Sequence, residues 1–263
     1  MRTFSLQCFG VGDGWPSANR NHSSFLYRLG EVTLLIDCGE PVSARFNATG
    51  LDYDSVDRIF LSHLHSDHIG GFFMLMQGFW LEKRRKDLSI CLPADGIAPI
   101  RGMLNAACLF DELFSFRLAF EPLKAAGPVM VRNARVTPYH TTHLNGFRRA
   151  FREIYPLAFE SFCFLIEWEG LRIGHSADIG GPEDLAPLVA APLDLLVCEM
   201  AHAHPENLFR YLKDKPIKQI LFIHLTRRLW KELDKTQALA AQMLPGIPFS
   251  FAHDGEEVLL NRQ

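Results

Sequence analysis

The sequence predicts an α/β fold, because segments typical of strands and of helices alternate along the whole chain. The alternation occurs in both halves, and no linker-like stretch separates them. We therefore expect one domain over residues 1–263, with two sheets packed together. Of the 263 residues, 48% are hydrophobic and 22% are charged, as in well-packed globular proteins. This composition excludes disordered and collagen-like chains.

Turn residues divide the chain into short apolar runs, which set the boundaries of the expected elements. Residues 10–21, rich in glycine and other turn formers, are predicted to form a long functional loop after the first strand. Strands are expected at residues 3–9, 24–29, 32–37, 57–62, 88–92, 129–138, 161–168, 171–175, 194–199 and 219–224 and within 249–260. Helices are expected at residues 41–49, 69–81, 96–113, 182–189, 205–212 and 229–243.

Charge and cysteine usage restrict the partners and the compartment. The net charge of −3 provides no global field that would attract nucleic acid or an anionic membrane. The N-terminus lacks a signal-peptide pattern, and prolines and an aspartate interrupt the apolar run 185–201, so no membrane span is expected. The six cysteines form no C-x-x-C pair and are predicted to be reduced, buried thiols of a cytoplasmic protein.

Two further segments have alternative interpretations. The basic string Lys83-Arg84-Arg85-Lys86 is interpreted as a solvated helix end rather than a nucleic-acid patch. The apolar segment 72–80 is expected in the core, with a homodimer interface as the alternative.

The motif that points most clearly to chemistry is the string His63-Leu64-His65-Ser66-Asp67-His68, which follows a predicted strand. A sharp turn between a strand and a helix can direct alternate side chains into one cavity. His63 and His65 can then share one metal ion while Asp67 and His68 turn toward a second. Without metal, this many buried polar groups would be costly to desolvate.

At these residues the chain resembles the metallo-β-lactamase fold superfamily, and the match continues along most of the sequence. Asp37, at the end of a predicted strand, resembles the early aspartate that supports the metal ligands in that family. The resemblance implies a four-layer αββα sandwich with two metal ions at one edge. Its implied ligands are His63, His65 and His140 for the first ion, Asp67, His68 and His224 for the second, and Asp178 for both.

The ligand types also indicate which ions would bind. Imidazole and carboxylate without thiolate favour two zinc ions, and manganese or iron would fit the same set. Family members with a redox di-iron centre carry a carboxylate at the position of His65, so hydrolysis is the expected chemistry. His143 is the alternative to His140, which we prefer because it ends its predicted strand directly.

Three stretches resemble the ribonuclease Z and phosphodiesterase branch of the superfamily: the loop 10–21, Ser176-Ala177-Asp178, and the segment 224–228. The resemblance implies a dinuclear phosphodiesterase, in which a hydroxide shared by both ions attacks phosphorus. A leaving alkoxide needs a proton, and we assign this role to His202, with Glu199 as its orienting partner and His204 as the alternative. Asp67 is also expected to orient the attacking water.

Departures from the ribonuclease Z pattern indicate a smaller substrate. No Gly/Pro-rich insertion that could form a tRNA-gripping arm lies between His68 and His140, and the string Cys198-Glu199-Met200-Ala201-His202 differs from the His-Glu-Ala-Thr typical of that enzyme. With the slight negative charge, this makes large RNA an improbable substrate. We expect a cyclic nucleotide or a small nucleic-acid fragment. Alternatives are a lactone, thioester or other carboxylic ester hydrolase, and a non-catalytic metal-binding or scaffold member of the fold.

Overall fold

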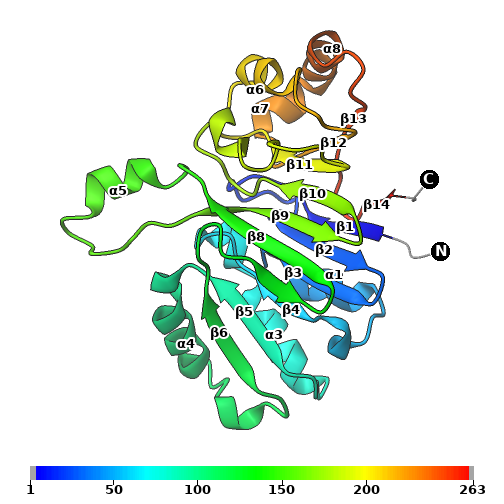
Figure 1. Cartoon of the computed structure of the whole chain (residues 1–263). Helices are drawn as coiled ribbons and strands as arrows, with labels where there is room; N and C mark the ends of the chain where they lie inside the picture. The colour runs from blue at the N-terminus through cyan, green and yellow to red at the C-terminus, as the bar shows by residue number, and fades with distance from the viewer. Residues whose placement is uncertain (1–3, 261–263) are drawn as a thin grey trace. The chain divides into compact units, whose positions relative to one another are not determined.

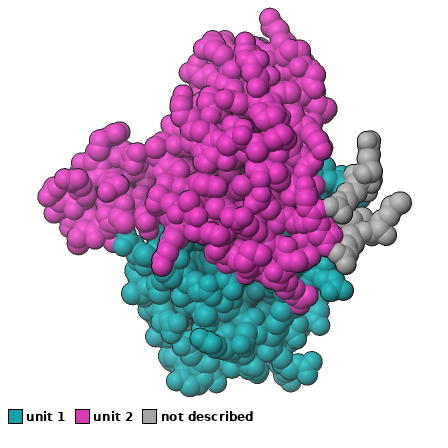
Figure 2. Space-filling model, viewed as in Figure 1, with its two compact units in different colours: residues 1–123, 253–263 teal, residues 124–252 magenta. Residues whose placement is uncertain are grey.

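The computed structural model describes residues 4–260. These residues form two compact units, coloured separately in Figure 2. Unit 1 comprises the described parts of Met1–Leu123 and His253–Gln263, and unit 2 comprises Lys124–Ala252. Each unit contains one seven-stranded mixed sheet, and the strands are labelled in Figure 1.

The sheet of unit 1 has the order β14-β1-β2-β3-β4-β5-β6. Pairing is antiparallel from β14 to β3 and parallel from β3 to β6. All five residues of β3 are buried, as expected for the strand where the pairing changes direction. The strands are β1 (Phe4–Gly10), β2 (Ser24–Leu29), β3 (Val32–Ile36), β4 (Arg58–Phe60), β5 (Leu88–Leu92), β6 (Leu118–Pro122) and β14 (Glu257–Leu260).

Helices of unit 1 cover one face of its sheet and form one apolar core with it. In α3, Phe72, Leu75, Met76 and Phe79 are all fully buried at helical spacing, so core burial of segment 72–80 is confirmed. The helices are α1 (Val42–Ala48), α2 (Ser66–Ile69), α3 (Phe72–Leu81) and α4 (Ile97–Ala106).

The sheet of unit 2 has the order β13-β12-β11-β10-β9-β8-β7, antiparallel from β7 to β10 and parallel from β10 to β13. Helices α6 and α8 pack on it around a second apolar core. The strands are β7 (Val129–Val131), β8 (Ala134–His140), β9 (Phe162–Trp168), β10 (Leu171–His175), β11 (Leu195–Glu199), β12 (Ile220–Ile223) and β13 (Phe249–Phe251). The helices are α5 (Asn145–Phe151), α6 (Pro205–Leu212), α7 (Arg227–Lys231) and α8 (Leu233–Met243).

One part of unit 2 was not foreseen from the sequence. Helix α5 and the residues after it extend away from the ends of β8 and β9 (Figure 1). The segment exposes Phe147, Phe151, Ile154, Tyr155 and Leu157, so these large apolar side chains are not part of the core of unit 2. The interval after His143 therefore carries a projecting arm, whereas the expected absence of an arm concerned the interval between His68 and His140.

Three predicted helices differ from those observed. The helix predicted at 96–113 ends with α4, since Cys108 adopts a left-handed φ of 58° that a helix cannot continue through. The helix predicted at 182–189 is reduced to a short 3₁₀ turn, Pro182–Leu185. The helix predicted at 229–243 is divided at Glu232 into α7 and α8.

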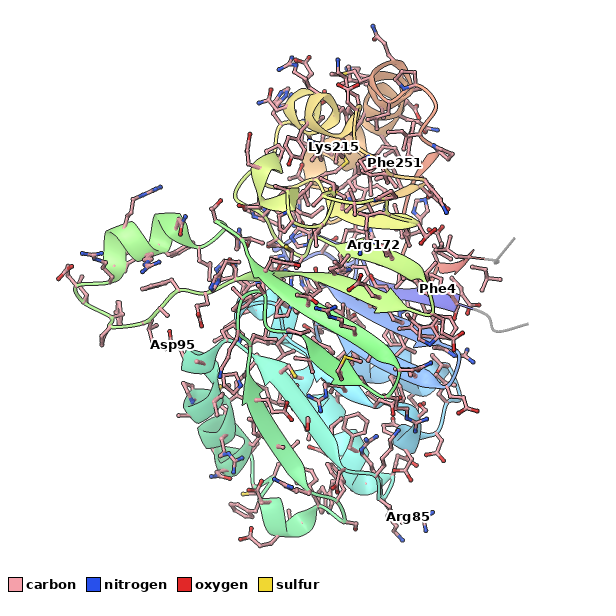
Figure 3. The ribbon with its side chains drawn as sticks, viewed as in Figure 1. Phe4, Arg85, Asp95, Arg172, Lys215 and Phe251 are labelled. Atoms are coloured by element: carbon pink, nitrogen blue, oxygen red, sulfur yellow. The ribbon has the colours of Figure 1, made fainter. Side chains whose placement is uncertain are left out.

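The basic string 83–86 is not uniformly solvated as predicted. Arg85 is exposed and points outward (Figure 3), but Arg84 is 1% exposed. The Arg84 guanidinium donates to the backbone carbonyls of Tyr53, Val56 and Asp87. Burial lowers the pKa of Arg84 to about 10. Arg84 is therefore a structural connector, whose role depends on carbonyls about 30 residues earlier in the chain.

The cysteines largely follow the prediction. Five are buried and free, and only Cys108 is exposed. Burial raises the pKa of Cys91 to about 11 and that of Cys163 to about 12. Within residues 4–260, no helix combines the length and apolar character needed to cross a membrane.

Candidate metal centre

Unit 1 presents its candidate ligands where β4 passes into α2. His63 is fully buried just after the strand, and His65 has the extended backbone of an N-cap residue before α2, which contains Asp67 and His68. The ring centroids of His63 and His65 lie 4.7 Å apart, and those of His63 and His68 lie 4.1 Å apart. The possible ligand atoms of His63 and His65, and separately those of Asp67 and His68, lie within 4.8 Å of each other. The motif therefore brings four possible metal-ligating side chains together, and their role as ligands stays a prediction.

Asp37 holds in place Ser62, which directly precedes this motif, and His68 within it. It follows β3 with a left-handed φ of 59°, and its side chain is completely buried. Its Oδ1 accepts from the Ser62 backbone N–H at 2.7 Å, and its Oδ2 accepts from the Ser62 hydroxyl at 2.8 Å and contacts His68 Nδ1 at 2.7 Å. With Nδ1 engaged, Nε2 is the His68 ring nitrogen that could bind a metal, and it lies 3.4 Å from Asp67 Oδ2.

The loop 10–21 lies against the same motif. Asp254 holds its base by accepting from the backbone N–H groups of Val11 and Asn21 at 3.0 and 2.8 Å. A Cβ at Gly14 would lie 3.3 Å from Asp67 Oδ2, so the loop passes directly beside this ligand. A Cβ at Gly39 would lie only 2.2 Å from the Asp67 backbone oxygen, which explains why glycine is required there. The anchoring role of Asp254 was not recognised in the sequence, because it joins the loop from the far end of the chain.

Unit 2 gathers its candidate ligands around Asp178, which follows β10 and is 3% exposed. Asp178 Oδ2 lies 3.6 Å from His143 Nε2, and Oδ1 lies 3.5 Å from His224 Nε2. The two carboxylate oxygens therefore face different histidines. A carboxylate with this geometry can serve two neighbouring ions.

The structure favours His143 over the preferred candidate His140. His140 ends β8 in an exposed position, where its ring stacks on Phe162 at 4.7 Å. The chain then turns back, because the Thr141 hydroxyl donates to the Asp178 backbone oxygen at 2.8 Å and the Thr142 backbone N–H donates to Asp184 Oδ2 at 2.8 Å. This turn carries His143 to Asp178. The pair of threonines was a local turn signal, but its partners lie about 40 residues away.

His202 and Glu199 form the expected pair. Glu199 is completely buried at the end of β11, and its Oε1 lies 2.9 Å from His202 Nδ1. Its Oε2 accepts from the backbone N–H groups of Ala201 and His202 at 2.5 and 3.1 Å. His202 Nδ1 also lies 3.8 Å from Asp178 Oδ2. His204 is exposed at the N-cap of α6.

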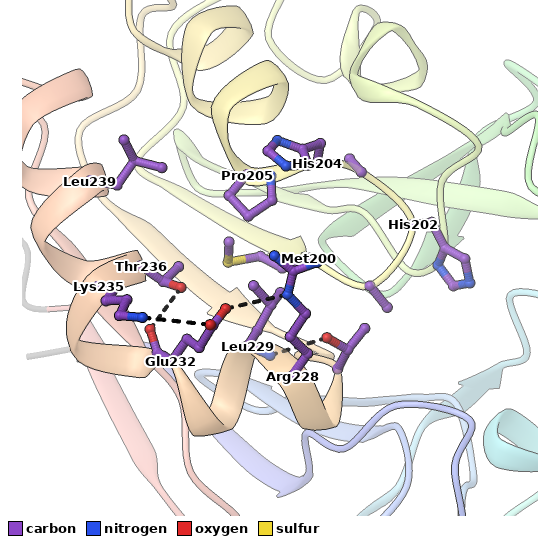
Figure 4. Close-up of a pocket in the computed structure, with 13 residues that line it drawn as sticks. Met200, His202, His204, Pro205, Arg228, Leu229, Glu232, Lys235, Thr236 and Leu239 are labelled. Carbon is purple, nitrogen blue, oxygen red and sulfur yellow. Dashed lines mark hydrogen bonds and ion pairs between the residues drawn. The ribbon is translucent and has the colours of Figure 1, made fainter.

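A pocket of about 470 Å³ opens beside His202 in unit 2. Figure 4 shows it between the loop 200–205 and helices α7 and α8, with Met200, Leu229 and Arg228 near the middle and Glu232 and Lys235 together at one side. A second pocket, of about 580 Å³, shares His202, Ala203 and His204 but extends toward Gly180 and Arg210. The loop that carries His202 thus borders two cavities.

The chain is similar to several known proteins. It is 30% identical over 158 residues to the ribonuclease Z of Methanocaldococcus jannaschii, covering 59% of this chain and 49% of that protein. The chain spans about half the length of the curated relatives it matches. The metallo-β-lactamase fold protein YhfI from Bacillus subtilis superposes with a TM-score of 0.77 at 19% identity, covering 98% of this chain and 100% of that one.

A crystal structure described as a new diphosphatase from the PhnP family superposes with a TM-score of 0.69 at 15% identity, covering 98% of each chain. The expected fold and the resemblance to the ribonuclease Z and phosphodiesterase branch are therefore confirmed. The sequence model of one family, described as anti-Pycsar protein Apyc1, matches residues 4–240.

Proposed function

Because the chain belongs to the anti-Pycsar protein Apyc1 family, we propose that it is a metal-dependent phosphodiesterase acting on a cyclic nucleotide or small nucleic-acid fragment. The observation that carries this proposal is the His202–Glu199 pair beside Asp178. A phosphodiester with a poor alkoxide leaving group needs a proton donor, whereas an ester with a good leaving group does not. The similarity to a ribonuclease Z supports the same chemistry.

We assign the ligands by chemistry and by their order along the chain. Every donor is an imidazole or a carboxylate, a set that suits zinc first and also manganese or iron. Two bound divalent ions would supply an activated water and would stabilise negative charge on the phosphate. The proposed ligands are His63, His65 and His143 for one ion, Asp67, His68 and His224 for the other, and Asp178 for both.

Glu199, His202 and Asp67 are assigned roles in proton transfer and in orienting water. Glu199 holds Nδ1 of His202, so that Nε2 is the atom that can give a proton to the leaving oxygen. Since Glu199 also accepts from the backbone around His202, the position of the imidazole is fixed before substrate binds. Asp67 is assigned to orient the attacking water, in addition to binding metal.

A small substrate is preferred over a large RNA. The net charge of −3 gives no general attraction for a long polyanion. The absence of an arm before His140 no longer supports this preference, because the α5 arm contains Arg148, Arg149 and Arg152. A direct comparison of a 3′,5′-cyclic nucleotide with a structured RNA would test the preference, and faster turnover of RNA would reverse it.

We also propose a reducing, cytoplasmic location. Five of the six cysteines are buried and free, which is ordinary in reducing compartments and uncommon in secreted proteins.

The first experiment is hydrolysis of bis(p-nitrophenyl) phosphate by protein loaded separately with zinc and with manganese. Turnover should depend on metal and should be lost in Asp67→Ala, while Asp111→Ala, which removes an exposed aspartate, should leave it unchanged. If both ions are bound but only a lactone or thioester is hydrolysed, the phosphodiesterase proposal is wrong. If bound ions support no hydrolysis at all, a non-catalytic role replaces it.

The role of His202 can be tested with two substrates whose leaving groups differ in their need for a proton. His202→Ala should reduce kcat for a 3′,5′-cyclic nucleotide by about 100-fold or more, because the leaving alkoxide loses its proton donor. The variant should largely spare bis(p-nitrophenyl) phosphate, whose p-nitrophenolate leaves without a proton. Equal losses on both substrates would show that His202 acts in another way.

A further inference from the structure

The pocket beside His202 has the size and lining of a small-molecule site. Its volume of about 470 Å³ lies within the range of about 300–1,000 Å³ that is usual for ligand pockets. All its lining residues lie between Met200 and Leu239, within unit 2. The loop that bears His202 forms one wall, and α7 and α8 form the other (Figure 4).

The lining is apolar on one side. Met200 and Leu229 are 1% and 9% exposed and come from the core, and Pro205 and Leu239 extend the same surface. Their side chains offer no strong hydrogen-bonding group to a ligand. A flat ring or a sugar face would bury apolar area against this surface.

The other side carries charged side chains that form long, exposed ion pairs with one another. The Glu232 carboxylate lies 3.3 Å from Arg228 Nε and 3.7 Å from Lys235 Nζ. These side chains are 39%, 80% and 82% exposed, in that order, and ion pairs so exposed contribute little stability. A ligand can therefore replace these contacts at small cost. The carboxylate can accept from ring N–H groups, while the two cations favour a nearby phosphate.

The chemistry of His202 connects this pocket to the scissile bond. In hydrolysis, water adds to phosphorus and the bond from phosphorus to the leaving oxygen breaks. The proton passes from His202 Nε2 to that oxygen, which requires the two atoms to lie within hydrogen-bonding reach. The group attached to the leaving oxygen therefore lies next to His202. We expect the rest of this group to occupy one of the two cavities that border His202.

The second cavity is less suitable for an apolar ring. Besides Gly180, Gly181, Pro182, Ala203 and the half-buried Tyr211, its lining consists of charged and polar side chains, among which Arg210 Nη1 donates to Asn207 Oδ1 at 3.3 Å. The apolar wall of Met200, Leu229 and Leu239 occurs only in the first cavity of these two.

We propose that the pocket formed by loop 200–205, α7 and α8 binds the nucleoside on the leaving-group side of the phosphodiester, with the base against Leu229 and Leu239 and its N–H groups facing Glu232. The part of this assignment that places the nucleoside on the leaving-group side rests on the proposed function. Binding of the nucleoside itself needs neither metal nor hydrolysis, so it can be tested separately.

The binding test measures the affinity of metal-free protein for adenosine by saturation-transfer NMR. Leu239→Trp should fill the pocket and weaken adenosine binding by about tenfold or more, the scale of one lost base-stacking contact. The matched control is Leu81→Trp, which makes the same exchange at an exposed leucine of α3 and should leave binding unchanged. Equal effects of the two variants, or no binding of adenosine by wild-type protein at millimolar concentration, would overturn the assignment.

A second variant avoids any effect of added bulk. Glu232→Ala should remove the preference for adenosine over purine riboside, which lacks the exocyclic amino group. Retention of the full preference would refute the contact with Glu232.

Turnover then tests whether the pocket takes part in the reaction. Leu239→Trp should lower kcat/KM for a 3′,5′-cyclic nucleotide by about tenfold, while Leu81→Trp should change it by less than about twofold. Equal effects of the two variants would contradict the assignment. If wild-type protein hydrolyses no phosphodiester, the proposed function fails, while the adenosine result still decides whether the pocket binds a nucleoside.

Discussion

Removal of the Asp37 carboxylate tests whether this buried residue organises the unit 1 ligands. Asp37 is completely buried and is the acceptor for the Ser62 N–H, the Ser62 hydroxyl and His68 Nδ1, all at 2.7–2.8 Å. Asp37→Ala leaves these donors buried without their acceptor. Each unsatisfied buried donor costs about 1–3 kcal/mol, and the costs are only partly additive because Ser62 supplies two of them.

We therefore expect Asp37→Ala to lower the free energy of unfolding by about 3–5 kcal/mol, a large part of the about 5–15 kcal/mol typical of a domain. Asp37→Asn keeps one carbonyl oxygen of the same size and should cost about 1–3 kcal/mol. The assay is urea unfolding of protein freed of metal with EDTA, so that loss of metal binding does not contribute. Asp111→Ala is the control and should stay within about 0.5 kcal/mol of wild type, since its ion pair with Arg101 is exposed.

The same variants should weaken metal binding. Without Asp37, the His68 ring loses the contact that fixes its orientation, and loss of such a partner typically costs about 10–100-fold in metal affinity. Competition with a chromophoric chelator would measure it. The reasoning is refuted if metal-free Asp37→Ala unfolds within about 0.5 kcal/mol of wild type, or if Asp37→Asn is as destabilised as Asp37→Ala.

Three further predictions concern parts of the molecule outside the metal centre. Arg84→Ala should destabilise the protein by about 3–5 kcal/mol in urea unfolding, because the buried guanidinium and its bonds to one buried and two less buried carbonyls are lost, and a loss below about 1 kcal/mol would contradict this role. In native protein one cysteine, Cys108, should react quickly with a thiol reagent at pH 8, since the other five are buried. Mass spectrometry of labelled peptides would identify the reactive cysteine. Fast labelling of a second cysteine would contradict the burial seen in the structure. The backbone N–H groups of Lys86 and Arg85 lower the pKa of Asp54 below its usual 3.8, so its stabilising contribution is present above that pH and is lost as the pH falls through the lowered pKa. The difference in unfolding free energy between wild type and Asp54→Asn should therefore shrink below about pH 4, and a difference that grows on acidification would exclude this cause.

The sequence predicted best where the functional residues are contiguous or directly follow a strand. The string 63–68 carries four candidate ligand side chains on one turn, and their grouping needs only the end of β4 and the start of α2. His224 likewise comes directly after β12. Strand ends could be located from apolar runs bounded by turn residues, and that was sufficient for these positions.

Prediction failed where contacts distant in sequence decide the local path. His140 is the last residue of β8, and the bonds from Thr141 and Thr142 to residues 178 and 184 help to bring His143 to Asp178. Arg84 is buried because carbonyls of residues 53 and 56 reach it. Neither partner could be read from the local sequence, since hydrogen bonds across about 30–40 residues leave no periodic pattern.

The pairing within each sheet explains why the candidate site residues occur where they do. Each sheet changes from antiparallel to parallel pairing at one strand, β3 in unit 1 and β10 in unit 2. Asp37 follows β3 directly, and Asp178 comes three residues after β10. At a parallel neighbour the carboxyl ends of the strands lie at the same edge, so β4, β11 and β12 deliver their following residues to the edge that already holds each aspartate. Left-handed backbone at Asp37, Ala177 and His224 turns the chain sharply at these strand ends, a conformation that costs about 1 kcal/mol or more at non-glycine residues. The contacts of Asp37 with Ser62 and His68, and of Asp178 with His143 and His224, are the interactions that can offset this cost.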